Sequence, residues 1–70
     1  MMSSQIVIKK IRLALCMEQE KFGNRLGVTR GTVCNWEAGR RVPQLSMIGE
    51  IRKLAHDNGL KVPSVEDFLN

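Results

Sequence analysis

The sequence contains few of the residues that form reactive or metal-binding sites. Its 70 residues include one histidine, two cysteines, one tryptophan, two phenylalanines and no tyrosine. Cys16 and Cys34 are eighteen positions apart and His56 is far from both, which is not the spacing of a zinc site or a cysteine–histidine catalytic pair. There is also no glycine-rich phosphate loop and no GxSxG motif. We therefore expect a protein that is not an enzyme, with no catalytic residues, no metal site and no cofactor.

Long apolar runs are missing as well. The run nearest the start, residues 6–8, is followed at once by Lys9 and Lys10, whereas about 18 apolar residues are needed to cross a bilayer. The start of the chain also lacks the charged and apolar regions of a secretory signal. A hydrophobic content of 43% with 26% charged residues is typical of a globular chain. The sequence thus predicts a cytoplasmic protein that does not contact membranes, with residues 1–70 forming one domain.

Positive charge predominates, and it is concentrated in the first part of the chain. Eleven Lys and Arg residues against seven Asp and Glu residues give a net charge of +4. Residues 1–41 carry eight of the basic and three of the acidic residues, a net +5, whereas residues 42–70 carry three and four, a net −1. This asymmetry on a small domain indicates a polyanionic partner, nucleic acid first, although ordinary solubility charge explains it equally well.

The spacing of apolar residues predicts an all-α fold with no strands. Gly27 is expected to end a helix in the left-handed conformation, and Thr29 to cap the next one. Pro43 cannot continue a helix but can precede one, and Ser64 with Asp67 resembles a capping box for a short last helix. The five expected helices cover about residues 5–17, 19–26 and 30–38, a segment from Leu45 to about Asp57, and a short segment after Ser64.

The helix expected at residues 30–38 has an unusual exposed face. At 100° per residue, Val33 and Trp36 fall on one side, and both are assigned to the core. The opposite side has short and nearly uncharged side chains, whereas most solvated helix faces carry long and charged side chains. Such a face is suited to a close approach to a partner. It consists of Gly31, Cys34, Asn35 and Ala38, with Thr29 and Arg30 at its leading edge.

Four short segments of the chain occur in a recognisable register. They are IKKIR at residues 8–12, QE at 19–20, LGVTR at 26–30 and WEAGRRVP at 36–43. Together they resemble the Cro/repressor-type (XRE) helix-turn-helix family, over about residues 6–57. The resemblance implies a five-helix, lambda-repressor-like DNA-binding domain with its helix-turn-helix at about residues 19–38. It also implies that the third helix enters the DNA major groove, usually in a homodimer on a palindromic operator.

The resemblance assigns roles by position. Gln19 is expected to contact a phosphate and to support the third helix. Arg12 and Glu37, which flank the core stripes of their helices, are expected to form a partly buried ion pair. Arg30 is suited to pairing with guanine and Asn35 with adenine. The base-reading set is Thr29, Arg30, Gly31 and Asn35, and the phosphate-binding set is Gln19, Thr32, Arg40 and Arg41.

Three positions depart from the family pattern. Glu18 stands where the family usually has a Ser or Thr cap, and Lys21 where a capping-box acid is common. Gly31 has no side chain at a position that often reads a base. Residues 58–70 match the family only loosely, yet we expect this segment to form the dimer contact. Its apolar residues are Val62, Val65, Phe68 and Leu69.

The sequence therefore predicts a sequence-specific regulator of transcription that binds double-stranded DNA, namely a repressor that blocks a promoter as a small homodimer. Two alternatives remain open. One is the antitoxin of a toxin–antitoxin pair, which represses its own operon and binds a toxin partner. The other is a protein-interaction module that keeps the fold without binding DNA. Glu18 and Gly31 favour that module, and the basic first part of the chain argues against it.

Overall fold

The structure, a computed structural model, describes residues 4–69 of the chain. Within this range the chain forms four α-helices and one 3-10 helix, with no strand, so the expected all-α class is confirmed. No helix in the described range is long and apolar enough to cross a membrane. The elements are α1 (Ser4–Ala14), α2 (Gln19–Leu26), α3 (Arg30–Glu37), α4 (Leu45–Asp57) and η1 (Val65–Phe68).

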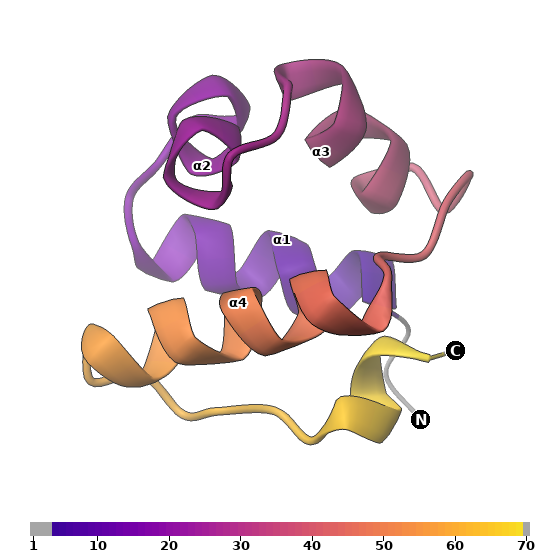
Figure 1. Cartoon of the computed structure of the whole chain (residues 1–70). Helices are drawn as coiled ribbons and strands as arrows, with labels where there is room; N and C mark the ends of the chain where they lie inside the picture. Colours follow the sequence, from indigo (N-terminus) through magenta and orange to yellow (C-terminus); the bar gives the residue numbers. More distant parts are fainter. Residues whose placement is uncertain (1–3, 70) are drawn as a thin grey trace.

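The helices are arranged around α1 (Figure 1). α2 and α3 pack against each other, and α3 also packs against α1. α4 contacts α2, while η1 packs against both α1 and α4. The last described element therefore returns to the first one, and α3 has its main contacts with α2 and α1 only.

The core is formed by side chains from all five elements. α1 contributes one stripe and α4 another, at the helical spacing that the sequence predicts. Trp36 is 4% exposed and Val33 is 0% exposed, so the assignment of both residues to the core is confirmed. The buried apolar residues are Val7, Ile8, Ile11, Phe22, Val33, Trp36, Ile48, Ile51, Leu54, Ala55 and Phe68.

The first helix is shorter than the sequence predicts. α1 ends at Ala14 and not near residue 17, because Leu15 and Cys16 form a turn. Cys16 has a φ of 55°, a left-handed conformation that is uncommon for residues other than glycine. Ser4, the first residue that the structure describes, is already the first residue of α1. Leu15 thus continues the apolar stripe of α1 although it lies beyond the last residue of the helix.

The last helix is a single 3-10 turn, and its position follows the expected capping signal. The carboxylate of Asp67 accepts the backbone N–H of Ser64 at 3.2 Å. Phe68 is completely buried, and Val62 and Val65 are partly buried against the core. The expectation that Phe68 belongs to an exposed dimer patch is therefore wrong. Because η1 packs on α1 and α4, its apolar side chains complete the core, and Leu69 at 57% is the exposed one.

The turn between α2 and α3 is fixed by two glycines. Gly27 ends α2 in the left-handed conformation, with a φ of 75°, which glycine adopts without steric cost. The backbone N–H of Val28 donates to the carbonyl of Gly23 at 2.8 Å. A Cβ added at Gly23 would lie 2.8 Å from the carbonyl oxygen of Val28 and 3.2 Å from that of Thr29. The turn therefore folds back onto α2 more closely than a side chain at position 23 would allow.

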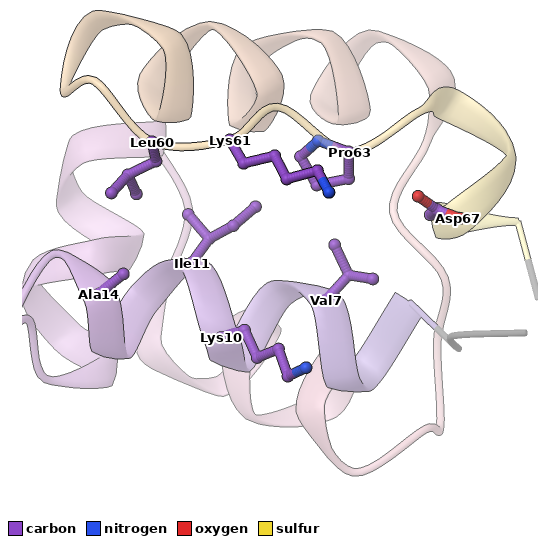
Figure 2. Close-up of a pocket in the computed structure, with 8 residues that line it drawn as sticks. All are labelled: Val7, Lys10, Ile11, Ala14, Leu60, Lys61, Pro63 and Asp67. Atoms are coloured by element: carbon purple, nitrogen blue, oxygen red, sulfur yellow. The ribbon is translucent and has the colours of Figure 1, made fainter.

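A groove runs between α1 and the segment that follows α4 (Figure 2). Its lining is largely apolar, and its charged members are two lysines and one aspartate. No residue of α2 or α3 lines it, so this groove is separate from the exposed face of α3. Its residues are Val7, Lys10, Ile11, Ala14, Leu60, Lys61, Pro63 and Asp67.

Candidate nucleic-acid interface

Two threonines cap the start of α3, one as the N-cap and one in the first turn. Thr29 is the N-cap, and its Oγ1 accepts the backbone N–H of Thr32 at 3.2 Å. The two hydroxyl oxygens lie 3.0 Å apart and share a second hydrogen bond. Threonine is a favoured N-cap because its hydroxyl serves an N–H that has no partner within the helix. The structure thus brings the predicted base-reading Thr29 and the predicted phosphate-binding Thr32 together at the exposed start of α3.

The side of α3 that faces away from the core carries no side chain at Gly31, its second residue. Arg30 and Gly31 are exposed, whereas Val33 is buried on the other side. A Cβ added at Gly31 would meet only Thr29 Oγ1, at 3.8 Å, so packing does not require glycine there. The main chain of α3 is therefore open to a ligand at this position.

Arg30 stands beside the start of α2. It lines a polar hollow together with Arg12, Glu18, Gln19 and Glu20. Glu18 is the N-cap of α2, and its side chain makes no capping hydrogen bond. Over residues 4–69, the ion pairs do not include one between Arg30 and either glutamate. Negative charge is nevertheless present next to the predicted base-reading arginine, at the place where the sequence departs from its family pattern.

The end of α3 is tied to the loop that follows it. Gly39 has a φ of 77° and reverses the chain. The carbonyl of Asn35 then accepts the backbone N–H of Arg40 at 2.9 Å and that of Arg41 at 3.3 Å. The side chains meet as well, since Arg40 Nη1 donates to Asn35 Oδ1 at 3.1 Å. Asn35 is half-buried, and both arginines are exposed, so three of the predicted DNA-contacting residues gather at this end of α3.

Arg12 and Glu37 lie in direct contact and join α1 to α3. Arg12 Nε and Nη2 donate to the two carboxylate oxygens of Glu37 at 2.7 and 2.9 Å, a bidentate geometry. The side chains are 11% and 7% exposed, and the hydrogen bond with Glu37 raises the pKa of the Arg12 guanidinium above its ordinary value. Gln19 Nε2 also donates to Glu37 at 3.3 Å, and Arg12 Nη1 donates to the carbonyl of Met17 at 2.9 Å. The start of α2 is thereby held against α3.

Two polar residues beside α3 were not predicted as part of the site. Gln44 and Ser46, at the start of α4, line a hollow that also contains Thr32, Asn35 and Arg41. The available signal was Pro43, because a proline followed by a helix marks a helix start whose first N–H groups are unpaired. The hollow places the beginning of a second helix next to the predicted phosphate-binding residues.

The described residues contain no group of three or more His, Cys, Asp or Glu side chains that could hold a metal ion. Cys16 is exposed, Cys34 is half-buried on the exposed side of α3, and both are free thiols. The arrangement offers hydrogen-bond donors and positive charges at both ends of an exposed helix side that has short side chains.

A comparison with family models identifies this architecture. A helix-turn-helix model matches residues 8–54, which include α2, the turn, α3 and most of α1 and α4. The chain belongs to the helix-turn-helix family, of the Cro/repressor (XRE) type. No curated protein and no solved structure matches the chain.

In this helix-turn-helix protein, α2 and α3 are the two helices of the motif. The second helix of such a motif is the one that DNA-binding members place in the major groove. α3 has an exposed side with short side chains, which suits close approach to base edges. The protein is a DNA-binding regulator.

Proposed function

We propose that this helix-turn-helix protein is a sequence-specific repressor that binds a palindromic operator as a homodimer, with residues 1–70 as one DNA-binding domain. The observation that carries the proposal is the exposed side of α3. Its short side chains are bounded by Arg30 at one end and by Arg40 and Arg41 at the other. A helix with this outline can enter the groove while the arginines reach the DNA.

The base contacts are proposed to come from the first and last turns of α3. Arg30 is exposed, and its planar fork can donate to both O6 and N7 of guanine. Gly31 lets the main chain approach closely, and Thr29 and Asn35 complete the base-reading set. Phosphates, which fix position and carry no sequence information, are assigned to Gln19, Thr32, Arg40 and Arg41. For Gln19 the contact uses the second Nε2 hydrogen, since the first is donated to Glu37.

The dimer is proposed because one copy of α3 reads too little sequence. Its eight residues span about 12 Å at 1.5 Å per residue, which covers only a few base pairs. Two copies on half-sites about one helical turn apart, roughly 34 Å, supply enough contacts for specific occupancy. Within the segment 58–70, the exposed Leu69 is the side chain we assign to the contact between copies.

A second candidate, a protein-interaction module, is favoured by one observation. Glu18 and Glu20 lie beside Arg30 at the start of α2, where a DNA phosphate would otherwise be expected, and carboxylates repel phosphates. The basic first part of the chain supports the DNA-binding proposal instead.

The two candidates are separated by selecting operators from random duplexes and then titrating salt. The repressor proposal expects an enriched palindrome with a fixed guanine in each half-site. It also expects an affinity that falls steeply as salt rises, because bound phosphates release counterions. Enrichment of no sequence, together with no binding to DNA even at low salt, would favour the interaction module.

A further inference from the structure

Asn35 and Arg40 are joined by a side-chain hydrogen bond that their separate roles do not explain. Arg40 Nη1 donates to Asn35 Oδ1 at 3.1 Å. Asn35 lies on α3, where it is proposed to read a base, whereas Arg40 lies in the following loop and is proposed to hold a phosphate. The bond therefore connects a contact that carries sequence information with one that does not.

The main chain holds the same two residues in register. The carbonyl of Asn35 accepts the N–H groups of both Arg40 and Arg41, after Gly39 has reversed the chain. Arg41 shares this backbone anchor, but within residues 4–69 the side-chain hydrogen bond to Asn35 comes from Arg40 alone. The two neighbouring arginines are thus matched in charge, exposure and anchoring, and they differ in their contact with the base-reading amide.

The chemistry of the bond fixes which way round the amide lies. A guanidinium has only donors, so it pairs with Oδ1 of Asn35 and not with Nδ2. The amide keeps one lone pair on Oδ1 and both hydrogens on Nδ2, which are the acceptor and the donor that a bidentate contact with adenine requires. Arg40 keeps the N–H groups of Nε and Nη2 for a phosphate. One arginine can therefore serve both contacts at once.

We propose that Arg40 is a positioning residue for base reading, which orients the Asn35 amide and so sets the preference at one base pair of each half-site. This inference rests on the proposed function, because it requires that α3 read bases. Arg40 and Arg41 then both add to the affinity for any DNA, but only Arg40 adds to specificity.

The test measures the dissociation constant for the selected operator and for operators that each have one substituted base pair. Asn35→Ala identifies the position, namely the one at which it abolishes discrimination. At that position the wild type is expected to discriminate by roughly 5- to 150-fold. Arg40→Ala should bring this ratio close to one while leaving the ratios at other positions unchanged. In the double variant Asn35→Ala/Arg40→Ala, the second substitution should change the ratio no further.

Arg41→Ala is the matched control, and it should weaken binding to both sequences alike while keeping the ratio. Arg40→Gln keeps a donor for Oδ1 but removes the charge, so it should retain most of the ratio and lose affinity. A ratio that survives Arg40→Ala, or that Arg41→Ala lowers as much, overturns the positioning role alone. A wild type that binds selected and random duplexes equally overturns the proposed function, and this inference with it.

Discussion

At the scale of single residues, the contact between Arg12 and Glu37 links the stability of the fold to the position of α3, the helix proposed to read bases. The two residues are 25 positions apart and form a bidentate, largely buried pair, and Glu37 lies on the same helix as the proposed base-reading residues. Because the hydrogen bond raises the pKa of Arg12, the contribution of the pair from this side is complete at every pH below the ordinary arginine pKa. It is lost only as the pH rises through the raised value, in strong alkali.

We expect Arg12→Met or Glu37→Met alone to lower the free energy of unfolding by about 3–5 kcal/mol, because each leaves the other charge buried without a partner. The double variant should cost much less than the sum of the two. Urea unfolding of the wild type and the three variants measures this coupling. Strictly additive effects would mean that the contact does not contribute to stability as a pair.

Arg30 carries a second prediction at this scale. Arg30→Lys keeps the charge but loses the fork that pairs with guanine, so binding to the selected operator should weaken by about 1–3 kcal/mol and binding to random duplexes far less. Both affinities are measured at one salt concentration, because the comparison has no meaning otherwise. A selected operator without a fixed guanine in its half-sites would remove this role from Arg30.

At the scale of elements, the packing of the turn between α2 and α3 requires a glycine at position 23. The requirement comes from lack of space for a side chain and not from an unusual backbone conformation. Gly23 lies inside α2, where glycine costs about 1 kcal/mol relative to alanine. The structure shows why it stands there, since the carbonyl of Val28 occupies the space of a side chain. The close approach is to the backbone of the turn at Val28 and Thr29, and it fixes how α3 follows α2.

Gly23→Ala is therefore expected to lower the melting temperature in spite of the better helix propensity of alanine. Gly49, in α4, is the matched control, since an added Cβ there would have no atom within 4 Å. Gly49→Ala should raise stability by about 1 kcal/mol, which corresponds to about 4–8 °C for a domain of this size. Equal gains for both variants would show that the turn can move away from α2.

At the scale of the whole molecule, the fold class and the positions of α2 and α3 could be predicted, whereas the end of α1 and the packing of Phe68 could not. Periodicity located the helices because the core stripes repeat at helical spacing. It placed the end of α1 too late because Leu15 continues the apolar stripe beyond the helix. Spacing alone could not decide whether Phe68 packs within the chain or on a second copy, because both bury an apolar residue equally well.

The candidate site could likewise be predicted only in part. The exposed side of α3 was readable from periodicity, and the roles of Arg12, Gln19 and Glu37 came from the resemblance. The contact between Asn35 and Arg40 was not readable, because it depends on the chain reversal at Gly39.

The dimer prediction belongs to this scale. Leu69→Glu should lower the fraction of dimer in sedimentation experiments without lowering the melting temperature, because Leu69 is exposed. Phe68→Ala should instead lower the free energy of unfolding by about 3–5 kcal/mol, because it leaves a cavity in the core. A wild type that stays monomeric at concentrations that saturate the operator, with one copy per site, would contradict the dimer.

The burial of Phe68 also has a consequence for the order in which the molecule is made. The ribosome releases a chain from its N-terminus, so α1 emerges long before the residue that completes the packing beside it. Until Phe68 has left the ribosome, part of the apolar surface of α1 and α4 has no cover. We therefore expect each newly made copy to pass through an interval in which α1 and α4 are present but the core is open, and to close that core only after Phe68 has left the ribosome.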